Sequence, residues 1–228
     1  GFVTVANSGE DFFIRKFDNY QYATSSRSSQ SFRVSPSFDT VAYHYSQDGN
    51  SSGIVIADVD TREILWGTSR ISYVISDWQP WNPYGTAFAY IHTLDAPRSP
   101  RFPSTEIAIV QKEESWEAEQ TTNFNDSSGT FTQFMLKWSI DGEKLGFWLI
   151  NTTTDEARLF VIDLESEEIL DLCVSLSSYY SEIFWSPNST QLVFKSENER
   201  IMLIDLEKRQ FTEFDFDMFK IIAWLERE

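Results

Sequence analysis

The chain has 228 residues, of which 41% are hydrophobic and 16% aromatic, so it can bury a sizeable core and is not expected to be disordered. Its 35 acidic residues exceed its 18 Lys and Arg residues, and the resulting net charge of −17 argues against nucleic acid or an anionic membrane surface as a partner. One cysteine, Cys173, and two histidines exclude an internal disulfide and a Cys/His zinc site.

The N-terminal part of the chain consists of short apolar runs separated by polar turns. Phe2–Ala6 and Asp11–Phe17 have the composition of strands, and Gln21–Ala23 is a candidate for the start of another. β-branched and aromatic residues dominate runs of this kind along the whole chain, and we find no convincing helical periodicity. The sequence therefore predicts an all-β protein.

The following segments repeat one motif, in which an apolar strand ends at a Trp position, a polar turn follows and a second apolar strand begins. Phe32–Tyr43 and Gln79–Tyr90 are weak copies, whereas Leu136–Phe147 (LKWSIDGEKLGF) and Ile183–Phe194 (IFWSPNSTQLVF) are clear ones. A further apolar strand closed by a polar turn follows each copy. These strands are Gly53–Asp60, Glu106–Lys112, Ala157–Glu165 and Arg200–Glu207. Short strands punctuated in this way are typical of antiparallel hairpins.

The position that Trp occupies in the clear copies, here called the Trp slot, sets the period of the repeat. The slots are Val34, Trp81, Trp138, Trp185 and Trp224, which lie 47, 57, 47 and 39 residues apart. That period suits four strands per unit. Only four residues follow Trp224, so the N-terminal strands are expected to complete the sheet that the C-terminal strand begins. Such a closure would remove open sheet edges.

The pattern W-S-x-D-G-x-x-L-x-F, followed by an apolar strand and I-D-L, resembles the TolB-like, WD40-like (PD40-type) β-propeller repeat family. The resemblance covers nearly the whole chain and implies a single β-propeller domain, residues 1–228, of four-stranded antiparallel blades. Five blades are detectable, at about 31–70, 71–130, 131–178 and 179–218, with the fifth split between 1–30 and 219–228. The usual TolB propeller has six blades, so a piece of a longer propeller is the alternative.

Residues that recur at the repeat period are interpreted as structural. Trp138 and Trp185 are expected to pack between neighbouring blades, with a hydrogen-bond partner for each indole N–H. Asp58, Asp163 and Asp205 stand at strand ends, where a carboxylate is expected to accept hydrogen bonds from turn amides.

We find no catalytic or metal-binding motif in the sequence. A glycosidase needs paired carboxylates, and the expected inner strands offer only Asp77 and Glu182. A serine peptidase needs a nucleophile elbow, which is absent, and only His44 and His92 could act as its base. The loop at Asp48–Ser52 lacks the ligand spacing of an EF-hand and is predicted to be a hairpin turn. We therefore predict no enzyme activity, no metal and no cofactor.

Two long insertions in the second unit indicate where a partner would bind. His92–Thr105 and Glu113–Gln133 are assigned to the loops that join strands two and three and that lead to the next blade, which share one face of a propeller. Arg and aromatic residues are favoured interface anchors. The candidate binding residues are Arg98, Arg101, Phe102, Trp116, Tyr179 and Tyr180. Loops that merely cover a blade edge are the alternative interpretation.

The predicted function is that of a non-catalytic, monomeric module that binds a protein or peptide through this loop face, as an interaction domain of a larger protein or complex. The alternative is a glycan-binding or glycoside-acting propeller that uses aromatics and carboxylates at its channel mouth. No apolar run is long enough to span a membrane and no targeting segment is recognisable, so membrane insertion is not expected. TolB-like relatives are often extracytoplasmic, and the composition is compatible with a periplasmic or secreted location.

Overall fold

The computed structural model shows an all-β protein. It describes residues 3–7, 12–16, 19–20, 29–47, 51–68, 80–94, 104–112, 116–125, 131–176, 181–198 and 200–214. These residues form antiparallel sheets in which strands that follow one another in sequence are neighbours. Within these ranges there is no helix, and hence none that could cross a membrane.

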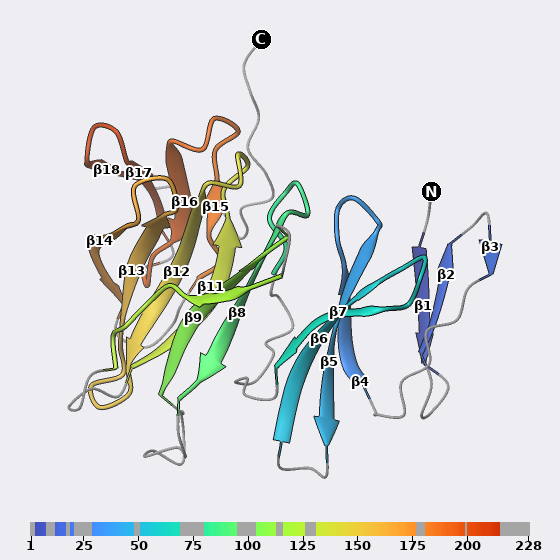
Figure 1. Ribbon diagram of the computed structural model, residues 1–228. Coiled ribbons are helices and arrows are strands. Elements are labelled where there is room, and N and C mark those ends of the chain that lie inside the picture. Colours follow the sequence, from blue (N-terminus) through green and yellow to red (C-terminus); the bar gives the residue numbers. More distant parts are fainter. Residues whose placement is uncertain are drawn as a thin grey trace.

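The strands form five sheets, here called A to E in chain order (Figure 1). Sheet A contains β1 (Val3–Asn7), β2 (Phe12–Lys16) and β3 (Asn19–Tyr20). Sheet B contains β4 (Ser29–Val34), β5 (Thr40–Gln47), β6 (Ser51–Asp58) and β7 (Ile64–Thr68). Sheet C contains β8 (Ala87–Thr93), β9 (Thr105–Gln111) and β10 (Ala118–Gln120). Sheet D contains β11 (Phe131–Trp138), β12 (Lys144–Asn151), β13 (Glu156–Asp163) and β14 (Glu168–Leu176). Sheet E contains β15 (Phe184–Trp185), β16 (Gln191–Lys195), β17 (Ile201–Asp205) and β18 (Gln210–Phe214).

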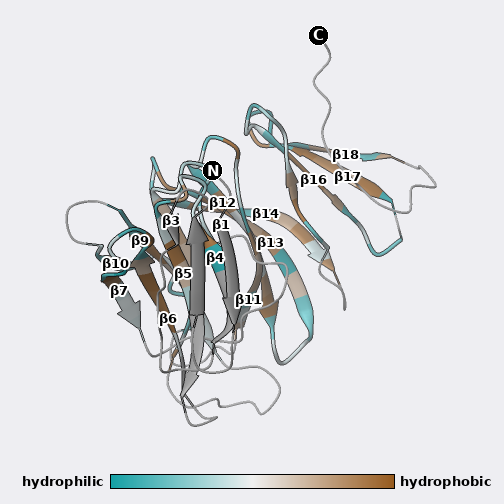
Figure 2. Cartoon of the chain, turned by 90° about the vertical axis from the view of Figure 1, so that its right-hand side faces the viewer, coloured by the Kyte–Doolittle hydropathy of each residue, from teal (hydrophilic) through white to brown (hydrophobic). Residues whose placement is uncertain are grey.

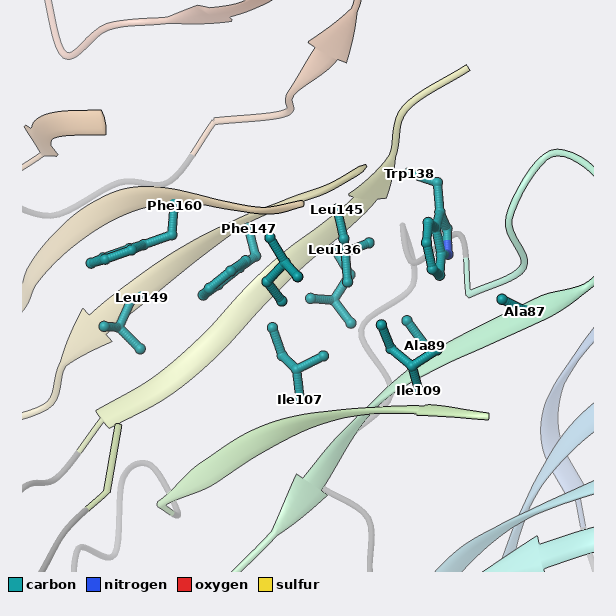
Figure 3. Close-up of a cluster of buried hydrophobic side chains, with 11 residues drawn as sticks. Ala87, Ala89, Ile107, Ile109, Leu136, Trp138, Leu145, Phe147, Leu149 and Phe160 are labelled. Carbon is teal, nitrogen blue, oxygen red and sulfur yellow. The ribbon is translucent and has the colours of Figure 1, made fainter. Parts of the chain in front are cut away.

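The middle strands of each unit are almost continuously apolar because both faces of their sheets are buried. In β12 the alternation of side chains sends Leu145, Phe147 and Leu149 to a cluster shared with sheet C, which Figure 3 shows. Trp148 and Ile150 point the other way, into a cluster shared with sheet E. A third cluster joins sheets B and C in the same way, so sheets B to E each pack face to face against the next.

The last strands of the units are more polar. β14 alternates between exposed and half-buried residues over most of its length, and β18 is exposed except at its end. Figure 2 shows the resulting pattern, with hydrophobic segments in the strands and hydrophilic residues in the turns and outer strands. Glu168 of β14 and Glu213 of β18 are among the exposed residues of these strands.

The predicted all-β class and the four-stranded antiparallel sheets are confirmed in sheets B, D and E. In sheet C only residues 80–81 of the expected first strand are described, and they make an isolated bridge between Trp81 and Phe88. Residues 215–228, which include Trp224, and residues 21–28 lie outside the described ranges. The number of blades in the complete ring and its closure therefore remain predictions.

Candidate binding site

The polar turn after each Trp slot has the same construction in sheets B to E. Its first residue is Ser35, Asn82, Ser139 or Ser186, and the backbone N–H of this residue donates to the carbonyl five residues later, over 2.8 to 2.9 Å. The side-chain oxygen of the same residue accepts a backbone N–H of the returning strand, for example 2.9 Å from Lys144 N to Ser139 Oγ. Asn82 makes the equivalent contact through Oδ1, at 3.1 Å from Ala87 N, and its Oδ1 also accepts the Thr86 N–H at 2.8 Å. The side chain thus fixes each turn from within.

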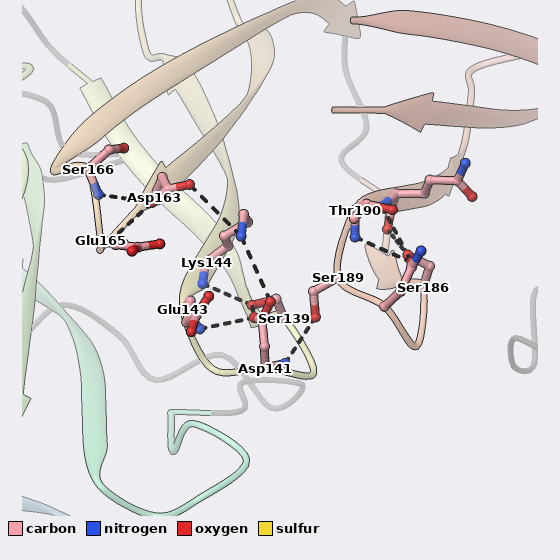
Figure 4. Close-up of polar contacts among 12 residues, drawn as sticks. Ser139, Asp141, Glu143, Lys144, Asp163, Glu165, Ser166, Ser186, Ser189 and Thr190 are labelled. Atoms are coloured by element: carbon pink, nitrogen blue, oxygen red, sulfur yellow. Dashed lines mark hydrogen bonds and ion pairs between the residues drawn. The ribbon is translucent and has the colours of Figure 1, made fainter. Parts of the chain in front are cut away.

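The fourth residue of each turn has a left-handed backbone, and it brings the turns of successive sheets together. Gly85 has φ +70°, and a Cβ at this residue would lie 2.9 Å from Ser37 Oγ in the preceding turn. Gly142 has φ +71°, and a Cβ there would lie 3.2 Å from Asn82 Nδ2. In sheet E this residue is Ser189, whose Oγ accepts the Asp141 N–H at 3.0 Å (Figure 4). The four turns therefore lie in sequence on one end of the molecule, here called the turn face.

The tryptophans in the slots join each sheet to the one before it. The indole Nε1–H of Trp81 donates to the Arg33 carbonyl at 3.1 Å. Trp138 donates likewise to Pro80 at 2.9 Å, and Trp185 to Lys137 at 2.9 Å. Each acceptor is the residue immediately before the preceding slot. The prediction that these tryptophans pack between neighbouring units with a bonded N–H is confirmed.

A cleft of about 580 Å³ opens where these repeated positions meet. Among the described residues, sheets B to E each contribute three equivalent positions to its wall: the residue before the slot, the slot itself and the residue two places after it. The lining residues are Arg33, Val34, Pro36, Pro80, Trp81, Pro83, Lys137, Trp138, Ile140, Phe184, Trp185 and Pro187. Ten of these twelve are apolar or aromatic.

Exposed hydrophobic residues in the turns lie at the cleft, as Ile140 does, and extend its surface, as Phe38 and Tyr84 do. Tyr84 is 61% exposed, Ile140 51% and Phe38 43%. All three belong to the turns of the turn face, and Tyr84 packs against the Gly142 turn of the next sheet. A set of exposed apolar side chains around an apolar cleft is a feature of protein interaction sites.

The charged residues of the cleft are both cations. Arg33 and Lys137 line it, and no Asp or Glu is among its described lining residues. Lys137 Nζ lies 3.2 Å from Glu182 Oε1 and 5.8 Å from the centroid of the Phe184 ring. The charged side chains that line the cleft are thus cationic, in a chain whose net charge is −17.

Five of the binding residues predicted from the sequence, Arg98, Arg101, Phe102, Tyr179 and Tyr180, lie outside the described ranges. The sixth, Trp116, is half-buried in the connection between β9 and β10, not in the loop that leads to the next sheet. Its ring stands edge-on to Trp81, with 6.3 Å between centroids. It therefore supports the Trp81 slot from within sheet C.

The residues considered for catalysis do not form a constellation in the described part of the chain. Glu182 pairs with Lys137, while Asp77 lies outside the described ranges. His92 lies on β8 with its ring 6.4 Å from that of Tyr90, and burial raises the pKa of this tyrosine to about 12. The described residues contain no group of three or more His, Cys, Asp or Glu side chains placed to hold a metal ion.

The structural interpretation of the recurrent aspartates is confirmed. Asp58 Oδ1 accepts the N–H groups of Asp60 at 2.8 Å and Thr61 at 2.6 Å. Asp163 accepts two turn amides at 3.1 Å in the same way, and Asp205 accepts the Lys208 N–H at 2.9 Å. These carboxylates close hairpins.

A buried polar network between sheets C and D has no counterpart in the sequence analysis. Glu106 is fully buried on β9, and its carboxylate accepts Thr122 Oγ1–H at 2.6 Å and Asn125 N–H at 2.6 Å. Asn125 Nδ2 also donates to the Thr105 and Phe131 carbonyls, at 2.7 and 3.1 Å. The network therefore holds residues 121–125 against the start of β11.

No family model and no curated protein matches the chain, whereas many solved structures do. TolB from Acinetobacter baumannii superposes with a TM-score of 0.52 at 13% identity, over 89% of this chain and 48% of TolB. A prolyl endopeptidase gives a TM-score of 0.64 at 15% identity, over 89% of this chain and 32% of that protein. The β-propeller domain of the Trilobed protease from Pyrococcus furiosus gives 0.57 at 14% identity, over 83% of this chain and 57% of that domain. This chain has a β-propeller fold.

The β-propeller neighbours confirm, at the level of fold, the resemblance carried by the repeat motif. They include propeller domains of peptidases, and the Pyrococcus furiosus domain is described as having an open velcro topology. The chain spans about half of TolB and about a third of the prolyl endopeptidase. Sheets B to E thus correspond to propeller blades, and the turn face is one end of the propeller.

The cleft was missed in the sequence because its residues were assigned to the repeat alone. Arg33, Pro80, Lys137 and Phe184 have no common chemistry, and only their constant place before the slot relates them. If equivalent positions of the repeat had been compared across the units, instead of each unit along its length, the two cations and the four prolines would have been found together.

Proposed function

We propose that the chain is a non-catalytic propeller module that binds a protein or peptide partner through the cleft of the turn face. The observation that carries this proposal is the alignment of three repeat positions from sheets B to E around one apolar cleft of about 580 Å³. A concave, mostly apolar site with a few polar groups is the usual form of a binding pocket.

The surroundings of the cleft favour a macromolecule over a small ligand. The exposed side chains of Phe38 and Tyr84 continue the apolar surface outside the cleft, where a small molecule would not cover them. The slot tryptophans are each at least nine-tenths buried and hydrogen-bonded to the preceding sheet. They support the wall of the cleft and leave contact with a partner to the prolines, Ile140 and Phe184.

The test is selection of peptides from a displayed library of random dodecapeptides on the folded, immobilised chain, followed by binding measurements with synthetic copies. Ile140→Asn changes a half-exposed residue of the cleft and is expected to weaken binding of the selected peptides by about tenfold. Ile169→Asn is the matched control, because Ile169 is 37% exposed on β14 and is not among the lining residues. Equal loss in both variants, or failure to enrich any peptide, contradicts the proposal.

The loop face remains a second candidate for the contact with a partner. Arg101→Ala combined with Phe102→Ala tests it on the same peptides, and a loss confined to this double variant would move the site to the loop face. A glycan array tests the alternative of a glycan-binding propeller. Specific glycan capture that Ile140→Asn abolishes would replace the peptide by a glycan as the ligand class. An extracytoplasmic location is part of the proposal and rests only on the TolB-like fold.

A further inference from the structure

The charged residues of the cleft indicate which side chains a partner would carry. This step rests on the proposed function. We infer that the cleft binds a peptide segment of a partner protein that carries both acidic (Asp or Glu) and apolar side chains. The chain carries 35 acidic residues, yet the cleft contains Arg33 and Lys137 and none of its described lining residues is acidic. Low-dielectric walls concentrate the field of such cations and favour an anionic ligand.

The hydrogen-bonding groups of the wall point to the same ligand. Among the four residues that precede the Trp slots, the carbonyls of Arg33, Pro80 and Lys137 already accept an indole N–H. Four of the twelve lining residues are prolines, which have no backbone N–H to offer. The strongest polar partners in the cleft are therefore the two cationic side chains, and these bind acceptor oxygens such as carboxylates.

Lys137 is positioned so that a ligand carboxylate can replace its present partner, Glu182. Its ammonium group pairs with Glu182, whose side chain is 45% exposed, while it stands over the Phe184 ring. An ion pair with an exposed carboxylate contributes little, so a ligand carboxylate can replace Glu182 at small cost. Glu182 thus competes with the ligand for Lys137.

The experiment compares peptides and variants in which only charge changes. Peptides selected on the wild-type chain are expected to be rich in Asp and Glu, and their Asn/Gln versions to bind at least about tenfold more weakly. Arg33→Gln and Lys137→Gln are each expected to weaken binding of the acidic peptides by about tenfold. Higher salt is expected to weaken binding of these peptides to the wild-type chain. Lys144→Gln removes the same charge from sheet D outside the cleft and is expected to leave binding unchanged.

Glu182→Gln provides a test in which both cationic side chains of the cleft stay in place. Removing the competitor is expected to strengthen binding of the acidic peptides by about two- to fivefold at low salt. Acidic and neutral peptides that bind equally well, or no gain in Glu182→Gln, would overturn the acidic class. If Ile140→Asn still weakens binding in that case, the peptide-binding function stands. If no peptide is enriched on the wild-type chain, both proposals fail.

Discussion

The junction between sheets C and D and the junction between sheets D and E share one end and differ at the other. At the turn face both are held by a slot tryptophan that donates to the preceding sheet, Trp138 to Pro80 and Trp185 to Lys137. At the opposite end the first junction contains the buried carboxylate of Glu106. The second has an apolar contact there, in which Trp148 packs on Phe194 and donates to the Ser181 carbonyl at 2.8 Å.

The difference shows which parts of the repeat are constrained. The turn face must bring each turn into contact with the next, so the slot, the capping Ser or Asn and the left-handed fourth residue recur. The opposite end only has to fill space and satisfy its polar groups, and an apolar cluster or a fully bonded polar network does both. The recurrent chemistry therefore gathers on the face that carries the cleft.

Substitution of Trp138 is expected to have the largest effect on the C/D junction. Trp138→Ala leaves a cavity against Ala87, Ala89 and Ile109 and is expected to lower the free energy of unfolding by about 3 to 5 kcal/mol. Trp138→Phe retains part of the volume and removes the indole bond, but the Pro80 carbonyl still accepts the Ala89 N–H at 2.8 Å, so the loss of this bond is expected to cost about 0.5 to 1.5 kcal/mol. Urea unfolding measures both. A Phe variant as stable as the wild type would mean that the indole bond contributes nothing.

Glu106→Gln breaks the polar end of the same junction and is expected to cost about 1 to 3 kcal/mol. The Glu106 carboxylate accepts hydrogen bonds from Thr122, Asn125 and Gln133, and a glutamine amide turns an N–H₂ group toward one or more of these donors. Glu119→Gln is the control, because Glu119 is exposed on β10 of the same sheet and is expected to change stability by less than about 0.5 kcal/mol. Equal effects in urea unfolding would show that the network is not a specific contact.

The repeat allowed much of the fold to be predicted. The Trp slots, the strand alternation and the recurrent aspartates each follow from local rules that hold in every unit, and the structure confirms the roles of Trp138, Trp185 and the three aspartates. Glu106, Thr122 and Asn125 could not be paired from the sequence, because they follow no period and meet only when residues 121–125 fold back on β9.

We expect the smallest change in stability from a substitution at the junction between sheets B and C, because the charged contact there is partly exposed. Asp39 in the turn after β4 pairs with Lys112 at the end of β9. Burial raises the pKa of Asp39, but the hydrogen bonds from Lys112, Ser37 and Ser35, together with the charge of Lys112, outweigh it and hold this pKa at about 2. A depressed carboxyl pKa stabilises the folded state above the unfolded value of 3.8, and this contribution is lost as the pH falls from about 4 to about 2.

Asp39→Asn is therefore expected to cost about 1 kcal/mol at pH 7, since solvent screening reduces the contribution of a side chain that is 42% exposed. The difference in stability between the wild type and this variant should shrink as the pH falls below 4, which urea unfolding at a series of pH values measures. Lys112→Met should shift the pH range over which the Asp39 contribution to stability is lost toward higher pH, because it removes the group that holds the carboxyl ionised. A difference that stays constant from pH 7 to pH 3 would contradict the ion pair as its cause. The cost would then belong to the bonds between Asp39 and the serines of its own turn, and the B/C junction would depend on Trp81 and its apolar cluster alone.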